Sequence, residues 1–356
     1  MSDTAYVPPL RSARRRPIQV APGHLVTAEG WPDVGSLPLL VRPKLDGLRL
    51  REWAEGQRQQ VDAWLNEYAV VLFRGFAVNG VEDFGQCVDA LAGGALEYRF
   101  RASPRTEVAH HIYTATDYPA DQAIFPHNEH AYSPVCPLVL AFFADVVPLR
   151  GGATPIGDNR AVMARIDPAL RDRFLRKGIL YVRNYGAGFG LPWRTVFQTE
   201  DRAEVERYCE SIGVHCEWKS GDRLCTRQVG PAMVRHPRTG EEIWFNHGTF
   251  FHVTSLPETI RDALLAEFAE DDLPQNTYYG DGERIEPEVL EHLRAAYTAS
   301  MVRFAWQPGD VMLVDNVLAV HAREPFSGYR RVLVAMAQTF RVAEYAVATS
   351  QSQDSV

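Results

Sequence analysis

The segment FPHNEHAYSP, residues 125 to 134, combines metal-ligand side chains at short spacing. Residues i and i+2 of an extended segment point to the same face, so His127 and Glu129 would converge on one point. An imidazole and a carboxylate aimed together can hold a divalent metal, although a third protein ligand must come from elsewhere. Two histidines, one carboxylate and open positions form the arrangement that non-haem Fe(II) oxygenases use. The alternative is a surface turn in which Glu129 pairs with a nearby base. Asn128 and His130 lie on the opposite face, where they would be either solvated or in contact with the ligand residues.

Other histidines give weaker signals for metal binding. His110 and His111 are adjacent, so their side chains point apart in an extended segment. Three more lack a carboxylate at i+2 and are predicted to be structural: His236, His247 and His252. His321 differs because it closes a strand–turn–strand pattern and precedes Arg330 and Arg331, which begin another predicted strand.

Composition limits the class of protein. The chain has 356 residues, 46% of them hydrophobic, and a formal net charge of −8, which gives no electrostatic reason to expect nucleic acid or an anionic membrane as partner. No stretch approaches the ~20 apolar residues that span a bilayer. The N-terminal arginines are followed by Pro17 rather than by an apolar run, so a secretory signal is not expected.

The cysteines indicate a reducing compartment, and we expect a cytoplasmic protein. There are five, an odd number, and none forms a CxxC pair. Cys209, His215, Cys216 and Cys225 could suggest zinc, but their spacing matches no standard zinc pattern.

Hydrophobic periodicity predicts a mainly β chain with surrounding helices. Helices are expected at 50–67, 81–93, 258–270 and 286–300, and from Asp158 or Asn159 to about 176 with a break near Pro168. Strands are expected at 69–73, 138–147, 179–185, 232–236, 242–246 and 330–340, and on both sides of a polar turn at Asp315 and Asn316. The predicted organisation is an irregular N-terminal arm (1–45), a single domain (46–342) and a C-terminal tail (343–356).

Four motifs in this order carry a family resemblance: FPHNEHAYSP, GGATPIGDNR, GDVMLVDNVLAVHAR and YRRVLVAM. Together with AVVLFRGF near the start, they resemble the taurine dioxygenase-like superfamily of Fe(II)/2-oxoglutarate oxygenases over roughly residues 65 to 342. Within it, the chain looks similar to the branch that contains the syringomycin-pathway aspartyl hydroxylase. The resemblance implies a double-stranded β-helix, or jelly-roll, core.

The resemblance also implies the cofactors and their ligands. His127, Glu129 and His321 would hold Fe(II), leaving open positions for 2-oxoglutarate and O2, and the reaction would yield succinate and CO2. Arg330 would anchor the distal carboxylate of 2-oxoglutarate, with Arg331 as the alternative, and Thr154 would support that carboxylate. A turn residue that satisfies its own backbone is the other interpretation of Thr154.

Two further positions of the motifs bear on the type of reaction and on the class of substrate. Glu129 fills the position that related halogenases leave small for chloride, which favours hydroxylation or another oxygenation. Taurine-type enzymes often carry a second arginine four residues beyond the first, whereas this chain has Val334 or Ala335 there. A sulfonate substrate is therefore not expected.

The substrate is predicted to be an amino acid or a carrier-bound aminoacyl group in natural-product biosynthesis. Candidate substrate contacts are Tyr113, Thr116, Gln122, Trp244 and Asn246, each of which could instead serve packing. The alternatives are a catabolic dioxygenase of a small non-sulfonate compound, a desaturase or epoxidase on the same scaffold, a zinc hydrolase, and a non-enzymatic jelly-roll binding protein. A homo-oligomer stays open.

Overall fold

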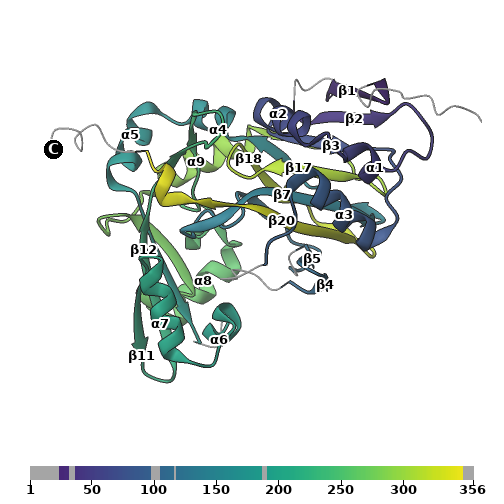
Figure 1. Ribbon diagram of the computed structural model, residues 1–356. Coiled ribbons are helices and arrows are strands. Elements are labelled where there is room, and N and C mark those ends of the chain that lie inside the picture. The colour runs from purple at the N-terminus through teal and green to yellow at the C-terminus, as the bar shows by residue number, and fades with distance from the viewer. Residues whose placement is uncertain (1–23, 32–36, 98–104, 116–117, 187–190, 348–356) are drawn as a thin grey trace, which may run out of the picture.

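The computed structural model describes residues 24–31, 37–97, 105–115, 118–186 and 191–347. Within these ranges, two β-sheets form the centre of the molecule (Figure 1). The larger sheet has eight strands, in spatial order β1 (Val26–Gly30), β2 (Leu39–Pro43), β3 (Val70–Phe73), β17 (Val311–Asp315), β7 (Val135–Val146), β20 (Arg331–Arg341), β5 (Ile112–Thr114) and β4 (Glu107–Ala109). The smaller sheet has four, in the order β16 (Met301–Val302), β9 (Ile156–Asp158), β18 (Ala319–Arg323) and β6 (Ile124–His127).

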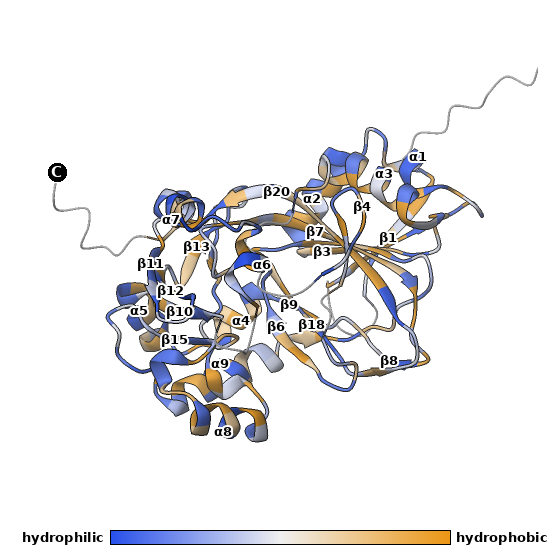
Figure 2. Cartoon of the chain, turned by 90° about the horizontal axis from the view of Figure 1, so that it is seen from below, coloured by the Kyte–Doolittle hydropathy of each residue, from blue (hydrophilic) through white to orange (hydrophobic). Residues whose placement is uncertain are grey.

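The two sheets face each other. Phe142 of β7 and His321 of β18 meet between them, with ring centroids 5.2 Å apart. β7 is buried along most of its length because β17 and β20 flank it and both of its faces are covered. The predicted jelly-roll core, and the continuous apolar strand within it, are confirmed. Figure 2 shows the strands of the large sheet as predominantly hydrophobic.

Three helices cover the outer face of the large sheet: α1 (Leu50–Ala54), α2 (Arg58–Tyr68) and α3 (Gly80–Ala92) (Figure 1). Phe84 of α3 stacks on Phe143 of β7 with ring centroids 5.2 Å apart, which anchors this helix to the sheet. The single helix predicted at 50–67 is wrong in one respect. Gly56, with φ of 78°, separates α1 from α2, because such a conformation ends a helix and glycine adopts it readily.

A third sheet and the remaining helices lie beside the small sheet (Figure 1). This sheet has the order β11 (His215–Lys219), β12 (Arg223–Gly230), β10 (Ile179–Tyr185) and β15 (Gln275–Tyr279). The helices are α4 (Asn159–Arg165), α5 (Pro168–Lys177), α6 (Trp193–Phe197), α7 (Arg202–Ser211), α8 (Glu258–Glu267) and α9 (Pro287–Thr298). Short elements complete this part of the chain: the pairs β13 (Met233–Arg235) with β14 (Glu242–Trp244) and β8 (Arg150–Gly151) with β19 (Phe326–Ser327), and the 3-10 helices Val253–Ser255, Glu270–Asp272 and Val342–Tyr345.

The break predicted near Pro168 is confirmed. Asp158 accepts a hydrogen bond from the backbone N–H of Arg160 at the start of α4, and Asp167 does so from Ala169 at the start of α5. Pro168 occupies the first turn of α5, where its missing N–H costs nothing. Helices α6 and α7 were not predicted, although Asp201 caps α7 in the usual way.

The irregular arm predicted for residues 1–45 needs correction. Within its described part, β1 and β2 extend the large sheet, and β2 pairs in parallel with β3. Leu39, Leu40 and Val41 are buried, so apolar packing holds β2 in the sheet. The surrounding prolines and glycines are typical of irregular segments, which is why the sequence did not predict this strand. The 3-10 helix Val342–Tyr345 crosses the start of the predicted tail at residue 343, and residues 348–356 lie outside the described ranges. The single domain of residues 46–342 stays a prediction.

None of the helices in the described ranges is both long enough and apolar enough to cross a lipid bilayer.

Candidate metal centre and adjoining cavities

Three metal-ligand side chains converge between the two facing sheets. His127 at the end of β6 pairs directly with His321 of β18, and Glu129 follows in the next turn. Each of the three offers a ligand atom, and these atoms lie within 4.8 Å of one another. The strand ends at His127, so Glu129 reaches the site from a turn, in which His130 has φ of 59°, rather than from an extended segment. The structure therefore brings together the three residues expected from the sequence, by a slightly different route.

Hydrogen bonds fix the orientation of this triad. The Nδ1 atom of His127 lies 2.8 Å from the carbonyl oxygen of Phe125 and donates to it, which leaves the Nε2 lone pair for a metal. The ring of Phe250 stacks on the other side of this imidazole, with centroids 4.5 Å apart and planes 13° apart. His127 is thus held in one tautomer and one plane.

Asn316 holds the backbone of Glu129 in place. Its amide oxygen accepts from the Glu129 N–H at 2.7 Å, and its amide nitrogen donates to the carbonyls of Glu129 (2.9 Å) and Pro137 (2.8 Å). Asp315 accepts from the N–H groups of Val317 and Leu318, each at 3.0 Å. The polar turn predicted at these two residues therefore ties the strand of His321 to the turn of Glu129.

The charges suit a divalent cation. Burial alone would raise the pKa of Glu129, but the charge of Arg105, whose Nη2 lies 2.7 Å from Oε2, holds that pKa well below its usual range. Burial lowers the pKa of both His127 and His321, which keeps the imidazoles neutral. Two neutral imidazoles and one carboxylate are the protonation states that metal binding requires, so the residues fit an iron site.

A small cavity adjoins the triad and contains the two residues expected to bind the cosubstrate. Its wall includes His127, His321, Thr154 and Arg330. Arg330 donates from Nε to the Gly152 carbonyl at 3.1 Å and from Nη2 to the Thr154 hydroxyl at 3.3 Å. Gly152 has φ of 69°, and a Cβ there would lie 2.6 Å from Pro148 and 3.1 Å from Arg330, so only glycine allows this approach.

Of the two adjacent arginines, only Arg330 lines the small cavity. Arg331 donates to Asp145 at 2.9 Å instead. The Thr154 hydroxyl accepts from Trp306 Nε1 at 2.9 Å as well as from Arg330, so its side chain is engaged with distant residues rather than with its own backbone.

A second, larger cavity of about 720 Å³ also adjoins the triad. It shares His127, Arg105 and Ile124 with the small cavity. Its aromatic wall consists of Tyr118, Phe125, Tyr132, Phe250 and Phe251, and polar side chains from Asp121, Gln122, Ser255 and Gln275 also line it. A space of this size beside the triad can hold a small-molecule substrate.

The predicted substrate contacts fall into three groups. Gln122 lines the large cavity. Three others lie in the packed interior and have structural partners: Tyr113 is buried in β5, Trp244 packs edge-to-face on Phe174, and Asn246 bonds Ala232 and Gly248. The structure thus assigns these three to packing rather than to the cavity wall. Thr116 lies outside the described residues.

Several residues of the site were not anticipated. Arg105 pairs with Glu129, and His247 and Phe250 stand beside His127. Burial lowers the pKa of His247 to about 3, and its Nε2 contacts the Asn128 carbonyl. No motif marks these positions, although the sequence FNHGTFFH does show histidine and aromatic residues gathered in one segment.

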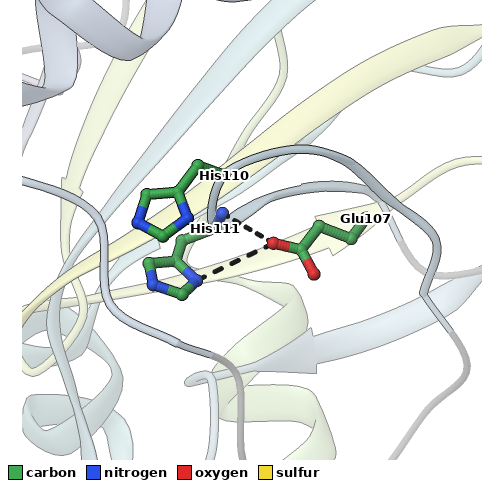
Figure 3. Close-up of side chains that lie close together, drawn as sticks. All are labelled: Glu107, His110 and His111. Atoms are coloured by element: carbon green, nitrogen blue, oxygen red, sulfur yellow. Dashed lines mark hydrogen bonds and ion pairs between the residues drawn. The ribbon is translucent and has the colours of Figure 1, made fainter.

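A further group of ligating side chains lies on the hairpin of β4 and β5, at Glu107, His110 and His111 (Figure 3). The Glu107 carboxylate accepts a hydrogen bond from the His111 N–H at 2.8 Å, which stabilises the turn. Glu107 and His110 are exposed, unlike Glu129 and His321. The buried triad, which adjoins two cavities, is therefore the stronger candidate for a catalytic metal.

Comparison with known proteins adds to this geometry. The family model for the taurine catabolism dioxygenase TauD, TfdA family, matches residues 34–337. The chain belongs to this family. The dioxygenase activity and the cofactors that the resemblance implied, Fe(II), 2-oxoglutarate and O2, are thereby confirmed, and a non-enzymatic binding protein and a zinc hydrolase are excluded.

Relatives and solved structures agree with this membership. The chain is 44% identical over 276 residues to the dapdiamide synthesis protein DdaC of Enterobacter agglomerans. The aligned region covers 78% of this chain and 84% of the relative. It is 30% identical over 315 residues to a clavaminate synthase-like protein of Arabidopsis thaliana, covering 86% and 91%. The crystal structure of PvcB from Pseudomonas aeruginosa has the same fold, with a TM-score of 0.53, 15% identity and coverage of 92% and 95%.

Proposed function

We propose that this dioxygenase hydroxylates an amino acid or an aminoacyl group, free or bound to a carrier protein, in the biosynthesis of a natural product. The observation that carries the proposal is the aromatic cavity of about 720 Å³ that opens directly onto His127 and Glu129. The similarity to a dapdiamide synthesis protein supports a biosynthetic role. The buried Val334 and Ala335 argue against a sulfonate substrate.

We assign the site residues as follows. His127, Glu129 and His321 hold the iron, and Arg330 with Thr154 holds the distal carboxylate of 2-oxoglutarate. When bound, iron, 2-oxoglutarate and O2 together supply the oxidation, in which the keto acid loses CO2 to give succinate and one oxygen atom goes to the substrate. The assignment is supported by the convergence of the triad and by the position of Arg330 and Thr154 in the adjoining cavity.

The chain's own residues bind and orient the cosubstrate and keep water away from the metal ligands. Arg330 presents a guanidinium that suits a carboxylate in both charge and shape. Phe250 covers one face of the His127 ring and also lines the large cavity, so it keeps water from that side of the metal ligands. The neutral His130 and His247, whose pKa values burial lowers to about 4 and about 3, add no positive charge beside the substrate.

The experiment offers the Fe(II)-loaded enzyme, with 2-oxoglutarate and O2, a set of free amino acids and the same residues loaded on carrier proteins. Mass spectrometry should show a gain of one oxygen on an amino acid or aminoacyl group, and none with His321→Ala. A gain only on loaded carriers would exclude the free amino acid. A loss of two hydrogens would show desaturation, and one oxygen added to an alkene would show epoxidation. Consumption of 2-oxoglutarate without any change in these substrates would contradict the proposed substrate class.

The cellular location of the protein is proposed from its cysteines. The five cysteines are all free and four of them are buried, which supports a reducing, cytoplasmic environment. A carrier-protein partner and a homo-oligomer stay predictions.

A further inference from the structure

Arg323 lies two residues beyond His321 on β18 and lines the small cavity together with Arg330. Its relative exposure is 7%, and among the described residues neither it nor Arg330 forms an ion pair with a carboxylate. Three other arginines near the two facing sheets are paired: Arg74 with Asp310, Arg105 with Glu129 and Arg331 with Asp145. A buried guanidinium (Arg323) beside a partly buried one (Arg330) is costly unless a ligand supplies an anion.

The two guanidinium groups share an aromatic ring. Phe326 of β19 lies 5.3 Å from the guanidinium carbon of Arg323 and 5.6 Å from that of Arg330, measured to the ring centroid. Burial and, to a smaller extent, the charge of Arg323 together lower the pKa of Arg330 to about 10. The cations are therefore close enough to repel each other, and an anion between them would relieve that repulsion.

Arg323 also holds one wall of the large cavity. It donates from Nη1 to the Tyr118 carbonyl at 3.0 Å, and from Nη2 to the carbonyls of Pro119 (2.6 Å) and Gln122 (2.8 Å). The backbone N–H of Phe326 donates to Ala120 in the same segment at 2.8 Å. The segment 118–122 contributes Tyr118, Asp121 and Gln122 to the large cavity. It is therefore fastened to Arg323, which lines the small cavity, and to the backbone of Phe326.

One hydrogen-bond donor of Arg323 has no partner among the described residues. This donor is the Nε atom, which is buried. The small cavity has room for about 30 Å³, which corresponds to roughly two water molecules and is less than a dicarboxylate needs. Entry of a dicarboxylate must shift the side chains of the wall, and Arg323 is the wall residue that carries the segment 118–122.

We propose that Arg323 is a positioning residue that couples occupancy of the small cavity by a dicarboxylate to the order of residues 118–122 in the wall of the substrate cavity. The bound carboxylate offsets the repulsion between Arg323 and Arg330 and receives the spare Nε–H. Arg323 then holds the three carbonyls of the segment more firmly, so the substrate cavity takes its final shape after the dicarboxylate binds. The inference rests on the proposed function only in naming 2-oxoglutarate as that dicarboxylate.

The test uses the whole protein loaded with Mn(II), and N-oxalylglycine as a dicarboxylate that is not turned over. Hydrogen exchange of a peptide spanning 118–123 is measured with and without saturating N-oxalylglycine, and the dissociation constant is measured by calorimetry. Three variants are compared. Arg323→Met removes charge and donors, Arg323→Lys keeps the charge but replaces the planar fork by a single ammonium, and Arg331→Met is the matched control.

In wild type and Arg331→Met, N-oxalylglycine should slow exchange in this peptide by about threefold or more. Arg323→Met should raise the dissociation constant by about tenfold. Arg323→Lys should bind within about threefold of wild type, because the charge is kept, yet lose the protection of the peptide. If Arg323→Met does not fold, Arg323→Lys still separates charge from clamping.

Protection in Arg323→Lys equal to that in wild type would overturn the proposal, as would a wild-type peptide whose exchange does not respond to saturating ligand. Failure of the wild type to bind N-oxalylglycine at all would overturn the assignment of the small cavity as well. Binding with unchanged coupling in the variants would overturn only the role of Arg323.

Discussion

His127 and His321 are direct cross-strand partners on β6 and β18, with ring centroids 4.4 Å apart. Two ligands far apart in the chain are thus placed by the register of one strand pair rather than by a flexible loop. The third, Glu129, is placed by Asn316, which lies in the turn that leads into β18. The geometry of the site therefore depends on a few backbone contacts that can be removed singly.

Replacement of Asn316 by alanine should destabilise the metal-free protein. It would leave the N–H and carbonyl of Glu129 and the carbonyl of Pro137 buried without a partner, which costs on the order of 3 kcal/mol or more. Urea unfolding measures this loss. Asn79→Ala is the control, since this exposed residue makes no side-chain capping bond at the start of α3. A free energy of unfolding within about 0.5 kcal/mol of wild type would show that Asn316 does not hold the turn.

The two adjacent arginines should differ sharply in their effect on 2-oxoglutarate. Arg330→Met should weaken its binding by about a hundredfold, because a buried guanidinium–carboxylate contact is lost. Arg331→Met should change it by less than about threefold, since Arg331 is held by Asp145 outside the cavity. Titration of the Fe(II)-loaded enzyme under argon measures both constants. The reverse order of effects would assign the cosubstrate contact to Arg331.

His252 should make stability fall in mild acid. Burial and, to a smaller extent, the charge of Arg294 together lower its pKa from 6.5 to about 4. The unfolded chain therefore binds a proton that the folded chain does not, so stability is full above pH ~6.5 and falls as the pH drops towards 4.

His252→Gln should flatten this part of the stability profile by a few kcal/mol, as measured by urea unfolding between pH 7 and 4. His24→Gln, at an exposed position, should leave the profile unchanged. A profile in His252→Gln that still parallels that of wild type would show that this histidine is not the group being protonated.

The sequence predicted the elements that carry strong local signals. β10 has the bounds expected from its β-branched and aromatic run, and Pro168 marks the start of α5 as expected. β1 and β2 were missed because short strands near the edge of a sheet are specified by their neighbours: β2 is a strand because it pairs with β1 and β3. Helix α7 was missed although Asp201 and the charged run after it gave a usable signal.

The triad could be predicted because family motifs mark all three residues, whereas its surroundings could not. Arg105 and Phe250 reach the site through tertiary packing, and nothing in their local sequence records that contact. Trp244 and Asn246 show the opposite error. Their residue types suit substrate binding, but β14 and the following turn direct them into the interior.

Binding of iron by His127, Glu129 and His321 is tested most directly by adding Fe(II) and 2-oxoglutarate to the protein without oxygen. Wild type should develop a weak visible charge-transfer band, as should the double variant His110→Ala, His111→Ala, which removes the exposed cluster of Figure 3. His127→Ala and His321→Ala should stay colourless. A wild-type protein that shows no band, or a band that survives loss of His321 but not loss of His110 and His111, would contradict the account.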